Sequence, residues 1–308
     1  RVGAGLALWV AWAGLASPVA GADAPPAAPP GTAPVTAPVT VGSKAFTEGV
    51  ILGELLTQTL RGAGIPATHR RELGGTRVVW NALRAGQVDA YVDYTGTLRH
   101  EILAGRVDAG ADLAAALAAH GVVLGPAPGF ANSYALAVRA ETARTLGLTR
   151  IGDLAAQPGL RVGVSHEFHD RADGWPGLAR AYGLPQRPAV LDHDLAYRAI
   201  GAGTLDVVDA YSTDAEIPHH DLTVLADDRA YFPRYEAVIV HRTDLPPAAR
   251  AALARLAGVL DAPGMARLNR AVKIQGRSES EVAAGFLRAR GIGGVRGSAA
   301  ASPWGREL

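Results

Sequence analysis

The chain contains 308 residues, a length that favours two domains, and its 48% hydrophobic content excludes wholesale disorder. Lysine and arginine total 30 against 29 aspartate and glutamate residues, and no long basic run is present, so we expect no nucleic-acid partner. Cysteine is absent, which excludes disulfides, thiolate metal sites and cysteine nucleophiles.

Residues 1–23 have the layout of a secretory signal peptide, because a basic residue, Arg1, precedes an apolar stretch over 2–16 and then a run of small residues. The apolar stretch is shorter than the roughly 18 to 20 residues that span a bilayer. We therefore expect export to the periplasm. Residues 24–38 are rich in proline and alanine, which favours an extended, solvated linker.

Strands and helices alternate in the first folded block. Apolar residues at helical spacing predict a helix from an N-cap at Thr47 to Arg61, before Gly62. The other elements predicted here are strands over Val39–Gly42, Ala67–Leu73 and Val88–Val92 and a helix over Thr76–Arg84. This alternation is typical of an α/β architecture with a mainly parallel sheet.

The same alternation continues in a second block and ends in helices. The predicted strands are Tyr134–Val138, Leu160–Val164, Ala189–Leu191, Leu205–Ala210, Leu222–Leu225 and Glu236–Val240. The predicted helices are Leu195–Ala202, Pro247–Leu260, Gly264–Ile274 and Ser278–Arg290. Residues 291–308 show no periodicity, and we expect a flexible tail there.

Glycines, hydroxyls and charges gather where predicted strands end, over Val41–Glu48 and Tyr91–Thr97. In an open α/β sheet, ligands bind at the carboxyl ends of the strands. Lys44 precedes the first helix and suits an anionic group such as a carboxylate. From these residues alone, a solvated surface lysine is an equally good interpretation.

Four tyrosines lie at or beside the ends of predicted strands: Tyr94, Tyr134, Tyr211 and Tyr235. Aromatic residues make up only 6% of the chain, so their repeated placement at loop positions suggests one shared aromatic pocket. Separate tyrosines in the core or at interfaces are the alternative. Position alone does not decide between the two.

Several separated motifs then make a specific resemblance. In chain order they read VGSKAFTEGVILGELLTQTL, GGT, NALRAGQVDAYVDYTGT, ANSYALAV, DAYSTDAEI and FPRYEAVIV. Together, from about Val39 to Arg290, they resemble the substrate-binding proteins of ABC importers for glycine betaine and related quaternary ammonium osmoprotectants. The resemblance implies a two-lobed, type II periplasmic-binding-protein fold with a hinge and an interlobe ligand cleft. Lobe 1 is expected over 39–131 plus 234–290, and lobe 2 over 132–233.

The resemblance also implies a ligand site. In the family, tyrosine faces enclose the trimethylammonium head, and the motifs place Tyr94, Tyr134, Tyr211 and Tyr235 on the four walls. A quaternary ammonium has no N–H to donate, so cation–π attraction to ring faces suits it.

The family's carboxylate grip corresponds to Lys44 and Thr97 in the first lobe and to Arg171 in the second. The pattern departs at Asn132, where some relatives carry an acidic side chain near the cage. Asn132 offers a carbonyl dipole without negative charge, which weighs against cationic ligands that lack a carboxylate, such as choline. The alternative interpretation is that Asn132 only shapes the hinge.

The histidines allow a competing hypothesis. His166 and His169 lie in a segment predicted as a loop, and His219 and His220 are adjacent. Histidine is a common zinc ligand, so the competing hypothesis is a secreted metal-dependent hydrolase. No HExxH motif is present and no serine lies in a GxSxG elbow, so catalysis has no positive signal.

We therefore expect a non-enzymatic, monomeric solute-binding protein that has no cofactor or metal. It would capture a quaternary ammonium ligand and deliver it to the membrane permease of an ABC importer. A binder of another small zwitterion, such as an amino acid, is the alternative within the same class.

Overall fold

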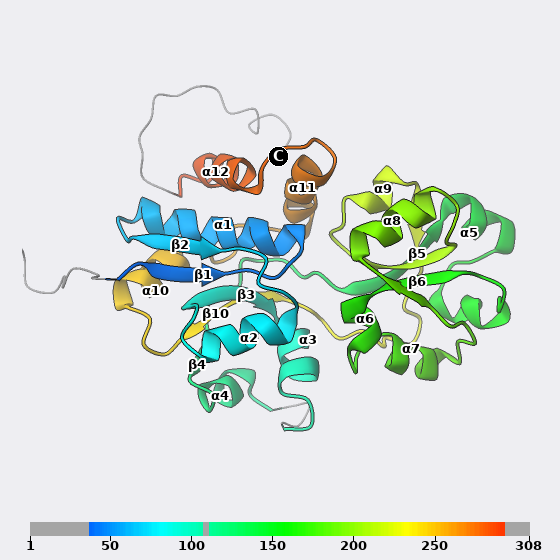
Figure 1. Cartoon of the computed structure of the whole chain (residues 1–308), viewed down its shortest axis with the longest axis horizontal. Helices are drawn as coiled ribbons and strands as arrows, with labels where there is room; N and C mark the ends of the chain where they lie inside the picture. The colour runs from blue at the N-terminus through cyan, green and yellow to red at the C-terminus, as the bar shows by residue number, and fades with distance from the viewer. Residues whose placement is uncertain (1–36, 107–110, 293–308) are drawn as a thin grey trace, which may run out of the picture. The chain divides into compact units, whose positions relative to one another are not determined.

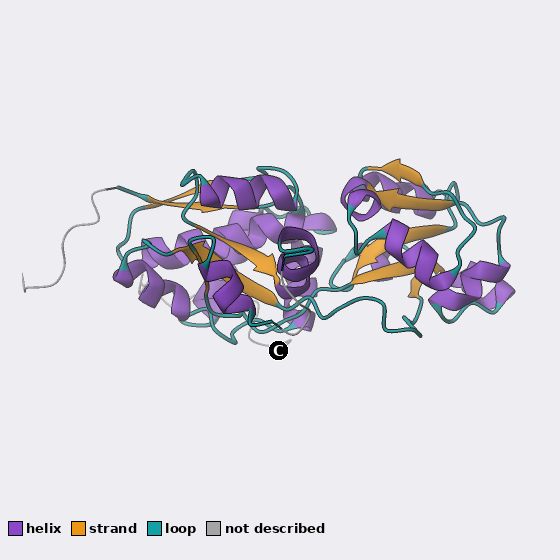
Figure 2. Ribbon diagram, turned by 90° about the horizontal axis from the view of Figure 1, so that it is seen from below, coloured by secondary structure: helices purple, strands orange, loops and turns teal. Residues whose placement is uncertain are grey.

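The computed structural model describes residues 37–106 and 111–292. The predicted signal peptide, most of the linker and nearly all of the predicted tail lie outside the described residues. The described residues form two five-stranded sheets with helices beside each (Figures 1 and 2). The first sheet has the order β2-β1-β3-β10-β4, and the second has the order β7-β6-β8-β5-β9.

The strands of the first sheet are β1 (Val39–Gly42), β2 (Ala67–Arg70), β3 (Ala90–Tyr94), β4 (Val122–Leu124) and β10 (Ala237–Arg242). Its helices are α1 (Thr47–Gly62), α2 (Thr76–Arg84), α3 (Thr95–Thr97), α4 (Leu113–Ala118), α10 (Pro247–Ala254), α11 (Ala262–Lys273) and α12 (Glu279–Ala289), with a π-helical turn over Leu98–Ile102.

The strands of the second sheet are β5 (Tyr134–Arg139), β6 (Val162–Ser165), β7 (Ala189–Leu191), β8 (Val207–Tyr211) and β9 (Leu222–Val224). Its helices are α5 (Ala140–Leu146), α6 (His166–Asp170), α7 (Trp175–Tyr182), α8 (His193–Gly201) and α9 (Glu216–His219), with a 3-10 helix over Ile151–Ala156.

Both sheets follow one plan of strand directions. In the first, β1 pairs parallel with β2 and β3, whereas β10 pairs antiparallel with β3 and β4. In the second, β6 pairs parallel with β7 and β8, whereas β5 pairs antiparallel with β8 and β9. The predicted mainly parallel sheet is therefore a mixed sheet in both cases, and each described sheet contains one reversed strand.

Alternating side chains of β3 explain how both faces of the first sheet are covered. Ala90 and Val92 belong to the core cluster that includes the leucines of α1, whereas Tyr91 belongs to the cluster that includes Trp80 of α2. Successive residues of a strand face opposite sides, so helices on both faces bury the whole strand. Helices α10, α11 and α12 pack on the α1 side (Figure 1).

Several predicted boundaries differ from the observed ones, and three of the differences have clear local causes. Thr47 is the first helical residue, and the extended Phe46 is the N-cap of α1. Strand β2 ends at Arg70, because Glu72 has a left-handed φ of 52° that ends the ladder. Helix α10 ends at Ala254, and Gly258 then turns with a φ of 65°.

The segment that contains His166 and His169 was predicted as a loop and is helix α6. Ser165 caps it, because the side-chain oxygen accepts a hydrogen bond from the Phe168 N–H at 3.3 Å. Ser165 Oγ also donates to Asp209 Oδ2 at 2.6 Å, which fixes the start of the helix to strand β8.

A buried hydrogen-bond chain fixes the loop after β1. His69 Nδ1 lies 2.8 Å from Glu54 Oε1 on α1, and His69 Nε2 lies 2.9 Å from Ser43 Oγ. The hydrogen bond with His69 lowers the pKa of Glu54 to about 2, although burial opposes this shift. Helix α1, strand β2 and the residue before Lys44 are thereby joined.

We expect Glu54→Gln to lower the free energy of unfolding at pH 7 by on the order of 1 to 3 kcal/mol. A carboxyl whose folded pKa is lowered adds stability above its unfolded pKa, and this stability disappears as the pH falls through the folded value. The difference from the unsubstituted chain should therefore shrink between pH 4.5 and pH 2. Urea unfolding across this range, with the exposed Glu141→Gln as control, measures it; a difference independent of pH would contradict the assignment.

Candidate functional site

Strand register brings the four predicted tyrosines to corresponding strand ends. Tyr134 begins β5, Tyr211 ends β8, and the two residues are directly paired. Tyr94 ends β3, where it pairs with Ala237 at the start of β10, and Tyr235 lies two residues before that start. Each reversed strand begins at the edge of the sheet where its antiparallel neighbour ends. All four rings therefore lie at the carboxyl ends of the parallel strands, where ligands bind in open α/β sheets.

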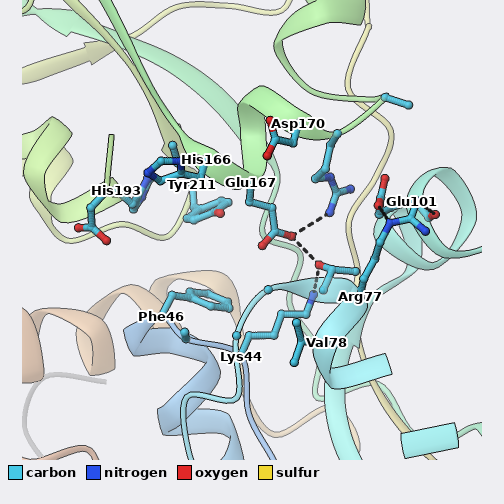
Figure 3. Close-up of a pocket in the computed structure, with 18 residues that line it drawn as sticks. Lys44, Phe46, Arg77, Val78, Glu101, His166, Glu167, Asp170, His193 and Tyr211 are labelled. Atoms are coloured by element: carbon cyan, nitrogen blue, oxygen red, sulfur yellow. Dashed lines mark hydrogen bonds and ion pairs between the residues drawn. The ribbon is translucent and has the colours of Figure 1, made fainter. Parts of the chain in front are cut away.

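All eight predicted site residues line one cavity of about 30 Å³. They are Lys44, Tyr94, Thr97, Asn132, Tyr134, Arg171, Tyr211 and Tyr235, and Phe46 and Glu167 complete the lining. A larger pocket of about 550 Å³ shares five of these ten residues with the cavity, including Lys44, Glu167 and Tyr211 (Figure 3). The larger volume falls within the usual range for small-molecule sites.

The rings of the cavity contact one another at aromatic packing distances. The Tyr134 ring centroid lies 5.2 Å from that of Tyr211 and 5.6 Å from that of Tyr235, the latter pair at 88°. Phe46 lies 5.7 Å from Tyr211 and closes another side. Burial raises the pKa of Tyr94 and of the other three phenols, so all four rings are neutral. Neutral rings present electron-rich faces to a cation.

Each predicted cation of the site is held by a buried carboxylate. Lys44 Nζ donates to Asp93 Oδ1 at 2.6 Å and to Thr76 Oγ1 at 2.9 Å. Arg171 donates to both oxygens of Asp173, at 2.8 and 2.6 Å. This two-point contact fixes the guanidinium plane and leaves its Nη1 for other partners.

Arg171 Nη1 donates to Thr97 Oγ1 at 3.2 Å and to Glu167 Oε1 at 3.3 Å. Thr97 follows β3 of the first sheet, whereas Glu167 and Arg171 follow β6 of the second. Two of the three predicted grip residues, Thr97 and Arg171, therefore contact each other, and the carboxylate of Glu167 shares the Nη1 donor of Arg171.

Asn132 makes contacts that the sequence analysis did not anticipate. Its Oδ1 accepts from the Ser212 hydroxyl and from the Thr213 N–H, both at 3.3 Å, and its Nδ2 donates to Glu48 Oε1 at 2.9 Å. The side-chain carbonyl is therefore engaged by the chain itself.

Glu48 is a buried residue on which a network of hydrogen bonds converges. Its carboxylate accepts from Tyr94, Asn132, Thr213 and Asn269, at 2.5 to 3.0 Å. Burial raises the pKa of Glu48 despite these four neutral donors. The Tyr94 hydroxyl is one of them, so Glu48 fixes the orientation of a predicted cage wall.

Gly96 of the YTGT motif is required by close packing. A Cβ at this position would lie 2.6 Å from Cδ1 and 2.7 Å from Cε1 of the Tyr235 ring. The Tyr235 hydroxyl donates to Asp173 Oδ2 at 2.7 Å, so the ring has no free direction in which to retreat.

Sequence reasoning missed five contributors: Phe46, Glu48, Asp93, Glu167 and Asp173. Phe46, Glu48 and Asp93 lie inside the quoted motifs, but no pattern in one sequence distinguishes a cavity wall from core. Glu167 stands four residues before Arg171, a spacing that places two side chains together once the segment is helical. The loop prediction for this segment concealed that signal.

The histidine clusters do not form a metal site in the described residues, where no group of three or more His, Cys, Asp and Glu side chains is suited to hold an ion. His169 pairs with the neighbouring Asp170, and the rings of His219 and His220 contact each other at 4.8 Å. His166 lines the larger pocket. The described part of the chain also contains no helix long and apolar enough to cross a membrane.

We expect Gly96→Ala to lower the free energy of unfolding by about 1 to 3 kcal/mol, because the added methyl overlaps the fixed Tyr235 ring. Gly159→Ala is the matched control, since a Cβ there meets no atom within 4 Å and the residue has no left-handed φ. It should change stability by less than about 0.5 kcal/mol. Equal effects of the two substitutions in thermal unfolding would refute the packing argument.

Comparison with known proteins identifies the family of the chain. The family model described as the substrate-binding domain of an ABC-type glycine betaine transport system matches residues 37–289. A glycine-betaine-binding protein of Pseudomonas aeruginosa is 32% identical over 80% of this chain and 86% of its own length. The ergothioneine transport permease/binding protein EgtU of Helicobacter pylori is 30% identical over 82% of this chain, but the match spans only 47% of that protein.

The solved structure of a glycine betaine/carnitine/choline ABC transporter superposes with a TM-score of 0.66 and 29% identity, over 82% of this chain and 99% of that chain. The two-sheet α/β architecture is that of the two-lobed periplasmic substrate-binding proteins. The chain therefore belongs to the family of substrate-binding domains of ABC-type glycine betaine transport systems.

Proposed function

We propose that this protein captures glycine betaine or a related quaternary ammonium osmoprotectant and delivers it to the membrane permease of an ABC importer. The observation that carries the proposal is the single cavity onto which Tyr94, Tyr134, Tyr211 and Tyr235 converge with the buried cations Lys44 and Arg171. The relatives' names support the ligand class.

The cage suits the head group for a physical reason. A trimethylammonium group offers no hydrogen-bond donor, so its attraction comes from ring quadrupoles and methyl contacts, about 0.5 to 2 kcal/mol per ring depending on desolvation. The Tyr94 and Tyr235 hydroxyls donate to Glu48 and Asp173, which fixes the rings before the ligand arrives.

A ligand carboxylate would be met by Arg171 Nη1, Thr97 and Lys44, which line the same cavity as the rings. These groups come from both sheets, so a ligand that contacts them all would favour the form in which they are close together. We propose lobes with the boundaries predicted above, 39–131 plus 234–290 and 132–233, that close on the ligand about a hinge.

The same role implies a monomeric, extracytoplasmic protein without catalytic activity, exported by the segment over 1–23. We expect no binding to nucleic acid. The alternative of a binder for amino acids or other small zwitterions is tested with matched ligands, since proline and proline betaine differ only in methylation of the nitrogen.

We expect Tyr134→Ala and Tyr211→Ala to weaken binding of glycine betaine by roughly 1 to 3 kcal/mol each, because each removes one ring face from the cation. Tyr134→Phe and Tyr211→Phe keep the face and should cost less. Tyr182→Phe is the control, since Tyr182 does not line the cavity and its hydroxyl donates to Asp227. Calorimetric titration measures the affinities, and alanine variants with unchanged affinity would disprove the cage.

A ligand panel tests the class itself. Glycine betaine, proline betaine, carnitine, choline and ergothioneine all carry a quaternary ammonium group, whereas proline does not. We expect proline betaine to bind and proline to bind at least tenfold more weakly. The N–H groups of proline would lose their hydrogen bonds to water in the aromatic cage, whereas the methylated nitrogen of proline betaine has no N–H to satisfy. Stronger binding of proline than of proline betaine would favour the amino-acid alternative.

Affinity for the quaternary ammonium ligand should not change after extended treatment with a chelator, and the purified protein should carry no stoichiometric zinc. This follows because the cavity is lined by rings, two cations, a threonine, an asparagine and a single carboxylate, which is not a zinc-ligand set. Elemental analysis alongside titration checks it. Loss of binding on chelation, restored by zinc, would favour the metal-dependent alternative built on His166 and His169.

A further inference from the structure

Glu167 is the carboxylate that lines both the cavity and the larger pocket. It lies in the first turn of α6, and its side chain is 29% exposed, in contrast to the buried Asp93 and Asp173. Figure 3 shows its carboxylate directed toward Lys44 and Phe46 across the pocket. In the sequence, this segment stands out only as a run of metal-ligand residue types.

The cations around the cavity each have a carboxylate nearer than Glu167, which shares Arg171 with Asp173 at the longer distance of 3.3 Å. Lys44 is matched by Asp93 at 2.6 Å, and Arg171 is matched by Asp173 at 2.6 Å. Arg77, which lines the larger pocket, is matched by Glu101 at 2.5 Å. Each of these three cations therefore has a close carboxylate partner other than Glu167, and Glu167 adds a further negative charge beside the ligand space.

Glu167 also occupies donors that a ligand carboxylate would use. Its Oε1 accepts from Thr76 at 2.5 Å and from Arg171 Nη1 at 3.3 Å, and Lys44 in turn donates to the Thr76 hydroxyl (Figure 3). Two carboxylates that share one guanidinium N–H repel each other, and the repulsion is strong where water is excluded. Glu167 therefore opposes the carboxylate of a zwitterionic ligand.

The other carboxylate oxygen of Glu167 remains free for a ligand. Within the described residues, the side-chain hydrogen bonds of Glu167 both end on Oε1, so Oε2 keeps its lone pairs. Gly75 leaves room beside it, because a Cβ there would lie 3.2 Å from Oε2. A ligand hydroxyl or N–H can reach this oxygen, and the bond would be charge-assisted.

We propose that Glu167 determines the specificity of this site by favouring quaternary ammonium ligands whose tail carries a hydrogen-bond donor over those whose tail carries a carboxylate. The inference rests on the proposed function, since it assumes that the head group occupies the tyrosine cage. The uncharged side chain of Asn132 led to the expectation that choline binds poorly. The inference reverses that expectation, because Glu167 of α6 supplies the negative charge that position 132 lacks.

Choline and glycine betaine are a matched pair of probes, because they share the trimethylammonium head and differ in a terminal hydroxyl against a carboxylate. In Glu167→Gln, which keeps the shape and removes the charge, we expect affinity for choline to fall and affinity for glycine betaine to rise. The ratio of the two dissociation constants should change by about tenfold or more.

The control is Asp170→Asn, which removes a charge from the same helix and the same pocket at a side chain that is 77% exposed. It should change the ratio by less than about twofold, because solvent screens an exposed charge. Glu167→Ala, made with the full chain and checked by thermal unfolding, repeats the test with a second side chain.

Equal changes for both ligands in the Glu167 variants would overturn the inference, because they would show that Glu167 only bridges Thr76 and Arg171. An unchanged ratio, with both ligands still bound, would overturn it as well and leave the proposed function standing. Failure of the unsubstituted chain to bind either ligand would overturn the proposed function and the inference together.

Discussion

The antiparallel pairing of one reversed strand in each sheet is the constraint on which the site depends. Strand β5 begins at Tyr134 beside the end of β8 at Tyr211, and β10 begins just after Tyr235 beside the end of β3 at Tyr94. A slip of one residue in either pair would turn the side chains to the opposite face of the sheet. The arrangement of the four tyrosines proposed as a cage therefore depends on strand register.

Electrostatic balance is the second principle of the site. Lys44 and Arg171 are both nearly fully buried, and an unpaired buried charge is strongly unfavourable. Asp93 and Asp173 remove that penalty and hold the cations in fixed orientations before any ligand enters. Asp93 and Asp173 neutralise these two cations, and Glu167 is the carboxylate that lines the cavity beside them.

Much of this organisation could be predicted from the sequence. Apolar patterns identified β1 and α2 with their observed bounds, and the eight residues named through the family resemblance all line one cavity. The remainder depends on long-range geometry. Nothing in the sequence around Glu48 indicates that Asn269, in a helix 221 residues away, donates to it, and nothing around Gly96 indicates the ring of Tyr235. The helix α6 was missed because its five residues are too few to show a period, and with it the contact between Glu167 and Arg171.

The Glu48 network has a consequence for the order in which the chain acquires its structure. Its donors come from β3, from the segment before β5, from the loop after β8 and from α11, so the last of them lies close to the end of the described chain. A nascent polypeptide that ends before Asn269 leaves this buried carboxylate without a full set of partners, and burying it would be unfavourable. Helix α11 does not line the cavity, yet a chain shortened before it would hold Tyr94 less firmly. The partners that orient Tyr94 in the proposed cage are thus complete only once Asn269 has been synthesised.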